Sequence, residues 1–153
     1  MSKVIWITGA GSGIGEELAK QYNENGNTLI LSGRKIQPLE DLAKTVQNAH
    51  VLQLDVTNEA DIAVATQKVL SKYGRVDVLI NNAGVSQRSL TKDITNEVGK
   101  TLMDVNFYGS INLTKALLPS MLAKNSGEIV VMSSAAGKFG FPLRSYYAAA
   151  KHA

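Results

Sequence analysis

Short apolar runs alternate with segments of helical periodicity along the whole chain, and this alternation predicts an α/β fold with one doubly wound parallel sheet. A parallel strand covered by helices on both faces forms a continuous apolar run. Five such runs occur, at residues 4–7, 28–31, 51–54, 76–80 and 129–132. No internal repeat or low-complexity linker interrupts them, so we predict a single domain over residues 1–153.

The segments between these runs have the periodicity of amphipathic helices. One helix is expected from Ile14 to Asn25, a second after Pro38, and a third after the capping candidates Thr57 and Asn58. The longest is expected over residues 95–124, where Pro119 should kink the last turns. Right-handed crossovers between parallel strands would place these helices on both faces of the sheet.

The composition is that of an ordinary globular domain and excludes several functions. The chain has 153 residues, of which 44% are hydrophobic and 19% charged, enough for one core. Cysteine is absent and the two histidines, His50 and His152, lie far apart in sequence, so we expect no disulfide and no metal site. The net charge of +3 is scattered, which argues against nucleic-acid binding but suits an anionic ligand.

Membrane insertion and secretion are not expected. No apolar stretch approaches the length of a membrane span, and residues 1–3 lead directly into the first apolar run, which leaves no room for a signal peptide. We therefore expect a cytoplasmic protein without a membrane partner.

A glycine-rich turn between the first apolar run and the first helix predicts a dinucleotide phosphate site. Residues 8–15 have the pattern T-G-x-x-x-G-x-G. Glycine allows backbone N–H groups to approach phosphate closely, and the start of a helix adds its positive dipole end. The candidate cofactor-binding residues are Gly9, Gly11, Ser12, Gly13, Ile14 and Gly15. The alternative is a merely flexible loop.

The end of the second run indicates which dinucleotide is bound. An acidic residue about twenty positions after the glycines would bond the 2′-hydroxyl of NAD. Gly33 stands there, followed by Arg34 and Lys35. A guanidinium can hold a 2′-phosphate with two parallel hydrogen bonds, so NADP(H) is favoured over NAD(H). Alternatively, Arg34 is an exposed loop charge without a partner.

Near the end of the chain, Tyr147 and Lys151 lie four residues apart on one helix face, and Ser134 follows the last apolar run. By itself the pair is more consistent with a solvated surface contact. With Ser134 and the glycine turn, it indicates an acid/base site. An ammonium stabilises a nearby phenolate, and a serine hydroxyl can donate to a carbonyl oxygen that gains negative charge.

The candidate motifs follow one another along the chain as residues 8–15, residues 81–84, Asn106, Ser134 and the Tyr147/Lys151 pair. In this order they resemble the motifs of the short-chain dehydrogenase/reductase family. The resemblance implies a Rossmann-like sheet with strand order 3-2-1-4-5, lacking the C-terminal strands of the full family fold. It implies that Tyr147 is the general acid/base, Lys151 its electrostatic partner, Ser134 the holder of the substrate oxygen and Asn106 the anchor of a water relay. It further implies cofactor contacts at Asp55, Val56, Asn82, Ala83 and Gly84.

Some of these residues have rivals or plainer interpretations. Tyr146 is a rival phenol, but the residue four positions on is Ala150, and Ser133 competes with Ser134. Asp55 could be a turn acid, residues 81–82 a turn dipeptide, and Asn106 a helix residue facing solvent. We interpret His50 and His152 as structural or solvent-facing.

The residues and the resemblance together predict an NADP(H)-dependent oxidoreductase that transfers hydride between the cofactor and a small carbonyl or alcohol substrate. A non-catalytic dinucleotide-binding scaffold and an inactive fragment are the alternatives. The chain is expected to be the N-terminal part of a longer protein, because residues 129–132 would otherwise leave an apolar sheet edge uncovered. We expect the full-length protein to be a homo-oligomer, and Ser86, Gln87, Arg88 and residues 139–143 to line the substrate entrance.

Overall fold

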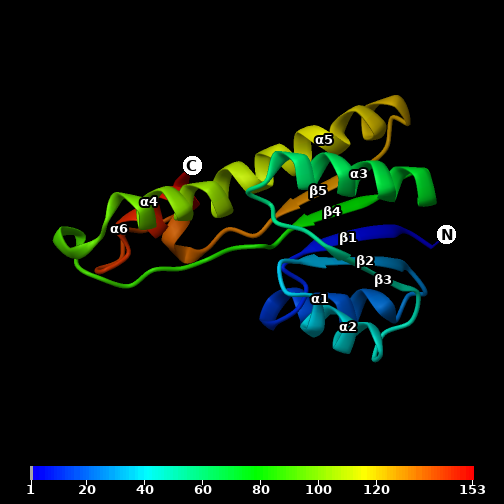
Figure 1. Ribbon diagram of the computed structural model, residues 1–153, viewed down its shortest axis with the longest axis horizontal. Coiled ribbons are helices and arrows are strands. Elements are labelled where there is room, and N and C mark those ends of the chain that lie inside the picture. Colours follow the sequence, from blue (N-terminus) through cyan, green and yellow to red (C-terminus); the bar gives the residue numbers. More distant parts are fainter. Residues whose placement is uncertain (1) are drawn as a thin grey trace.

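The sheet has five parallel strands in the order β3-β2-β1-β4-β5, which confirms the predicted fold class and strand order (Figure 1). This sheet is seen in a computed structural model of the chain, which describes residues 2–153. The strands are β1 (Val4–Thr8), β2 (Thr28–Gly33), β3 (Ala49–Gln53), β4 (Val78–Asn81) and β5 (Glu128–Val131). The order reverses between β1 and β4, and such a switch point is where ligands bind in open α/β sheets.

Helices cover both faces of the sheet. Helices α1 (Gly13–Asn23) and α2 (Ile36–Ala43) lie on one face, and α3 (Glu59–Tyr73) and α5 (Gly109–Ala123) lie on the other (Figure 1). Helix α4 (Asn96–Met103) and helix α6 (Ser145–His152) lie together beyond the carboxyl ends of the strands. No helix among residues 2–153 is long and apolar enough to span a bilayer.

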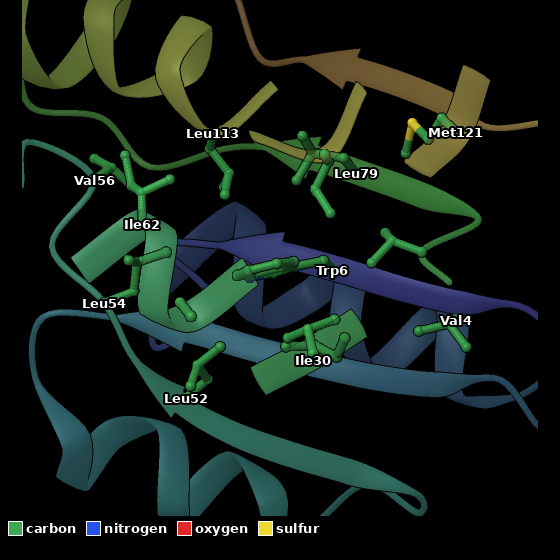
Figure 2. Packing of buried hydrophobic residues seen from close by; sticks show 14 of the residues in the cluster. Val4, Trp6, Ile30, Leu52, Leu54, Val56, Ile62, Leu79, Leu113 and Met121 are labelled. Carbon is green, nitrogen blue, oxygen red and sulfur yellow. The ribbon is translucent and has the colours of Figure 1, made fainter. Parts of the chain in front are cut away.

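The core consists of two layers because successive side chains of a strand point to opposite faces. In β1, which is buried throughout, Ile5 and Ile7 pack with α1 and α2, whereas Trp6 packs toward α3 and α5 (Figure 2). The Trp6 indole donates to Ser32 Oγ at 2.9 Å, and Ser32 donates to the carbonyl of Ile7 at 3.2 Å. Hydrogen bonds thus satisfy the polar atoms at the centre of the sheet.

The long helix predicted for residues 95–124 is interrupted. A π-helical turn, η2 (Asp104–Tyr108), separates α4 from α5, and α5 continues past Pro119. A π turn closes i→i+5 hydrogen bonds and so accommodates one more residue than an α turn. The spacing of apolar residues over 95–124 could not reveal the π turn, because the residues before and after that turn keep the same helical period.

Strand β5 forms the exposed edge of the sheet. It pairs with β4, and all four of its residues are exposed, including Ile129 and Val131. The predicted apolar sheet edge is therefore present in the structure.

Candidate active site

The glycine turn is packed so tightly that two of its glycines cannot be replaced without displacing backbone. A Cβ on Gly15 would lie 2.4 Å from the carbonyl oxygen of Gly9, and one on Gly9 would lie 2.9 Å from Ala83 Cα. Gly9 and Gly13 also adopt positive φ angles of 64° and 57°, which glycine tolerates best. The turn is thus a fixed structure rather than a merely flexible loop.

The amino end of α1 is open to a ligand. Its first residue, Gly13, has no atom within 4 Å of its Cβ position, and Ile14 beside it is 61% exposed. Ser12, at the N-cap, forms no side-chain cap hydrogen bond. The first N–H groups of a helix have no partner within the helix, so these donors fit a phosphate group.

A network around Thr8 joins the glycine turn to the segment after β4. Thr8 Oγ1 accepts from the N–H groups of Asn82 and Ala83 at 3.0 and 2.9 Å, and it donates to Ile80 O at 3.3 Å. Asn82 Nδ2 donates to the carbonyls of Thr8 and Gly9 at 3.0 and 3.2 Å. The Asn82 side chain therefore fixes the start of the glycine turn. Sequence reasoning did not single out Thr8, although it begins the motif.

A cavity of about 130 Å³ opens beside this turn at the carboxyl ends of β1, β2 and β4. Six predicted cofactor residues line it, namely Gly9, Arg34, Asp55, Val56, Ala83 and Gly84. Asp55 also has a local role, because its Oδ1 accepts from the N–H and the hydroxyl of Thr57 at 2.9 and 2.8 Å. The cofactor-contact and turn-acid interpretations of Asp55 are therefore compatible.

Arg34 lies between this cavity and a second one of about 400 Å³ that is also lined by Lys68. None of the ion pairs within residues 2–153 involves Arg34. Its carbonyl is fixed by Gln53 Nε2 at 2.9 Å, but its guanidinium remains available to an anion.

Ser134 and Tyr147 line one cavity of about 520 Å³. Ser134 is the N-cap of the 3₁₀ turn η3 (Ala135–Gly137), where its Oγ accepts from Ala136 N at 3.2 Å. Tyr147 comes from α6 and is half-buried. Two hydroxyl-bearing residues from different elements thus line one space.

Lys151 lies behind this cavity, one helical turn after Tyr147. Its Nζ donates to the carbonyl of Met132 at 2.8 Å and lies 3.8 Å from the Cβ position of Gly84. Partial burial lowers the pKa of the Lys151 ammonium below its usual value, and the charge of Tyr147 raises the pKa to a smaller extent. Lys151 and Tyr147 thus interact electrostatically across one face of α6.

Asn106 lies within the π turn η2 and is only 5% exposed. Its Oδ1 accepts from Val85 N at 3.0 Å, and its Nδ2 donates to Val85 O at 2.9 Å. The interpretation of Asn106 as a solvent-facing helix residue is therefore wrong, because the extra residue of the π turn directs the side chain inward. Asn106 and Lys151 line a common cavity of about 250 Å³.

The structure separates the two candidate hydroxyls from their rivals. Tyr146 packs against α4, where its ring atoms would lie 2.5 to 2.7 Å from a Cβ on Gly99 and its hydroxyl donates to Asn96 Oδ1 at 3.4 Å. Ser133 Oγ donates to the carbonyl of Lys151 at 3.4 Å. Neither rival lines the cavity shared by Ser134 and Tyr147.

Sequence reasoning missed Arg144. Its Nη1 donates to Ser86 Oγ and, at 2.9 Å, to the carbonyl of Gln87, and its guanidinium lies 5.8 Å from the centroid of the Tyr147 ring. The available signal was that Arg144 stands three residues before Tyr147, because residues i and i+3 are neighbours on a helix. The contacts with residues 86–87 cross more than fifty positions and had no signal in one sequence.

Of the residues predicted to line the substrate entrance, Gln87, Phe139 and Gly140 do not line the cavity that contains Tyr147. Ser86, Arg88, Phe141 and Leu143 line the same cavity as Tyr147, whereas Gln87 Nε2 donates to Leu143 O at 3.2 Å. Within residues 2–153, no cluster of three metal-ligating side chains occurs.

These features define a class, that of α/β proteins with a glycine-rich turn at the switch point and a Ser–Tyr–Lys set beside it. The sequence profile of the family described as short chain dehydrogenase matches residues 3–153. The chain belongs to this family of oxidoreductases.

Curated relatives share about two fifths of their residues with the chain. The human dehydrogenase/reductase SDR family member 7 is 42% identical, and the match covers 98% of this chain and 47% of the relative. The mouse dehydrogenase/reductase SDR family member 7B is 41% identical, covering 98% and 49%. The chain thus spans about half the length of these relatives.

Solved structures match the fold closely. A short-chain dehydrogenase from Streptomyces avermitilis superposes with a TM-score of 0.94 at 38% identity and covers 99% of this chain and 56% of its own. A metagenomic short-chain oxidoreductase solved with NADP gives 0.94 at 30% identity, covering 97% and 70%. A Burkholderia phymatum homologue solved with NAD gives 0.95 at 29% identity, covering 99% and 56%. Structural neighbours therefore include complexes with both dinucleotides.

Proposed function

We propose that the protein is an NADP(H)-dependent oxidoreductase that interconverts a carbonyl compound and an alcohol. The observation that carries this proposal is the convergence of Ser134 and Tyr147 on one cavity, with Lys151 one turn behind the phenol. Membership of the short chain dehydrogenase family supports it.

The cofactor would be held by the elements around the switch point. The amino end of α1 and the glycine turn would bind its phosphates, and the cavity lined by Asp55, Val56 and Ala83 would take the adenosine. The bound dinucleotide supplies or accepts the hydride. Lys151 would reach its ribose hydroxyls, since the ammonium lies near Gly84 and the end of β5.

Tyr147 would pass the proton. In the reductive direction its hydroxyl donates to the substrate oxygen, and Ser134 Oγ donates a second hydrogen bond that stabilises the developing negative charge. The Lys151 ammonium stabilises the phenolate that remains. Asn106 would anchor a water relay to Lys151, since both residues line the cavity of about 250 Å³, which is roomy enough for several waters.

The preference for NADP(H) rests on Arg34. This guanidinium borders the adenosine cavity, has no acidic partner among residues 2–153, and follows β2 where an NAD-binding protein would carry a carboxylate. A 2′-phosphate would supply the missing partner.

The test of the catalytic proposal is Tyr147→Phe in the full-length protein. We expect kcat for NADPH-dependent carbonyl reduction to fall by about 10²–10⁴-fold, because the ring remains and only the proton donor is lost. The NADPH Kd, measured by cofactor fluorescence, should stay within about twofold, as expected when a mutation removes only transition-state interactions.

Tyr146→Phe is the matched control, because that ring faces α4. It should leave kcat within about twofold, since Tyr146 contacts no reacting group. Undiminished turnover of Tyr147→Phe would rule out the assignment.

A further inference from the structure

The cavity beside Ser134 and Tyr147 is lined by positively charged side chains and by no negatively charged ones. Its lining includes the guanidinium groups of Arg88 and Arg144 and no carboxylate. The other lining residues are neutral: Ser86, Ser134, Ala135, Ala136, Phe141, Pro142, Leu143 and Tyr147. A space built only for a neutral ketone has no need of two cations.

The two chain segments that form the walls of this cavity also contain basic residues and no acidic ones. Residues 129–153 contain Lys138, Arg144 and Lys151 but no Asp or Glu, and residues 81–92 contain Arg88 and Lys92 but no Asp or Glu. The acids that bound these segments are engaged elsewhere. Asp93 pairs with Lys92 at 3.3 Å, and Glu128 pairs with Lys3 at 2.9 Å at the opposite end of β5. Among residues 2–153, no carboxylate therefore lines the cavity.

The two arginines are held differently. Arg144 is half-buried, donates to Ser86 Oγ and Gln87 O, and lies against the Tyr147 ring, so its position is fixed before any ligand arrives. Arg88 is exposed, and within residues 2–153 its side chain forms no ion pair or hydrogen bond. A guanidinium offers five donors in a planar fork that fits a carboxylate.

The phosphates of the cofactor do not account for these charges. They would lie at the glycine turn, and no residue of this turn lines the cavity that contains Arg88 and Arg144. Arg88 and Arg144 instead line the cavity that Ser134 and Tyr147 also line.

We infer, on the basis of the proposed function, that the substrate is a carbonyl compound bearing a carboxylate close to the carbonyl, that Arg88 binds this carboxylate, and that Arg144 reinforces the positive field. Reduction of such a 2-oxo acid takes up one hydride at the carbonyl carbon and one proton at its oxygen. The products are a 2-hydroxy acid and the oxidised dinucleotide. The carboxylate is unchanged and serves to orient the carbonyl toward Ser134 and Tyr147.

A charged and a neutral substrate of nearly equal shape test the inference in the full-length protein with NADPH. The probes are benzoylformate and its methyl ester. We expect kcat/KM for the acid to exceed that for the ester at least tenfold. Arg88→Gln should lower kcat/KM for the acid about ten- to hundredfold, mostly through KM, and leave the ester within twofold, because a charge-assisted hydrogen bond is lost.

Lys138→Gln is the matched control, since it removes one positive charge from the same wall outside the cavity lining. It should leave both substrates within twofold. Arg88→Lys should retain part of the preference because it keeps the charge but loses the fork. Equal use of acid and ester by the wild-type protein, or equal losses on both in Arg88→Gln, would overturn the inference.

A binding measurement separates this inference from the proposed function. With the protein saturated with NADP⁺, calorimetry should show benzoate binding at least tenfold more tightly than benzamide, and Arg88→Gln should abolish the difference. Reduction of the ester without a preference for benzoate overturns the carboxylate site and leaves the oxidoreductase proposal intact. Selective benzoate binding without reduction of either probe overturns the proposed function and supports the carboxylate site. If neither reduction nor a preference for benzoate is observed, both the proposed function and the carboxylate site are overturned.

Discussion

Arg34 is the side chain on which the proposed preference for NADP(H) depends. It lines the cavity of about 130 Å³ beside the glycine turn, and its guanidinium forms no ion pair among residues 2–153. Arg34→Ala should raise the NADPH Kd about ten- to hundredfold, because two charge-assisted hydrogen bonds to the 2′-phosphate are lost. NADH, which lacks that phosphate, should bind within twofold of the wild-type protein. Fluorescence titration of both cofactors measures the difference.

Lys44→Ala is a suitable control, since Lys44 is an exposed cation paired with Asp41 on α2. It should change neither Kd. Equal weakening of NADPH and NADH in Arg34→Ala would show that the arginine does not read the 2′-phosphate.

At the scale of secondary-structure elements, the π turn η2 matters most because it turns Asn106 inward. The Asn106 amide forms both hydrogen bonds available from Val85, one to its N–H and one to its carbonyl. Asn106→Ala leaves these two backbone groups without partners and should reduce the free energy of unfolding by about 1–3 kcal/mol. Urea denaturation measures the loss.

Asn112→Ala provides the comparison on α5, because Asn112 is half-buried and forms only one long hydrogen bond to Glu59, at 3.4 Å. Its effect should stay below about 0.5 kcal/mol, as is usual for surface substitutions. If both variants lose the same stability, the side chain of Asn106 does not support the segment after β4.

The contact between β3 and α3 makes stability depend on pH. Burial lowers the pKa of His50 below 6.5, and the Lys72 ammonium at 3.3 Å from Nδ1 lowers it further. As the pH falls below about 6.5, the unfolded chain takes up a proton before the folded protein does, so stability decreases.

The effect should remain below about 1 kcal/mol because solvent screens this partly buried group. His50→Gln should flatten the pH dependence of the unfolding midpoint between pH 7 and 5. Identical slopes for the two proteins would exclude His50 as the source.

The sequence predicted the elements well where one physical pattern dominates. The runs that became β1 and β2 are buried on both faces, so their composition was sufficient to identify them. Strand β4 begins at Val78 rather than at residue 76, and the Asp77 side chain just before it accepts from Val4 N at 2.7 Å. Such a contact between distant residues leaves no trace in local periodicity.

The candidate site was predictable to the extent that it consists of motifs. The glycine turn and the Tyr147/Lys151 pair have fixed spacings, whereas the contacts of Arg144 depend on how two loops meet in space. The hydrogen bonds of Asn106 also required the structure, because a π turn and an α turn are indistinguishable in an apolar stripe.

At the scale of the whole molecule, one residue reports on the core layer between the sheet and helices α3 and α5. Trp6 is the single tryptophan, is fully buried in the central strand, and is bonded to Ser32 of β2. Its fluorescence should shift to the red on unfolding, as the indole enters water. In a urea titration its midpoint should coincide with that of far-ultraviolet circular dichroism, since the domain should unfold as one cooperative unit.

Separate midpoints would mean that the layer containing α1 and α2 and the layer containing α3 and α5 unfold independently. Trp6→Phe, which retains an aromatic core side chain, would then serve to measure the stability lost with the indole hydrogen bond.

Leu143 adopts a left-handed conformation with φ of 65°, and its carbonyl accepts from Ser89 N at 3.1 Å as well as from the Gln87 amide. Arg144 adds further bonds to residues 86 and 87. A non-glycine residue in this region costs about 1–3 kcal/mol, which these bonds offset. Anyone who transplants the specificity of another enzyme onto this scaffold must therefore exchange both loops together, because either loop grafted alone would lose the anchor points that the other provides.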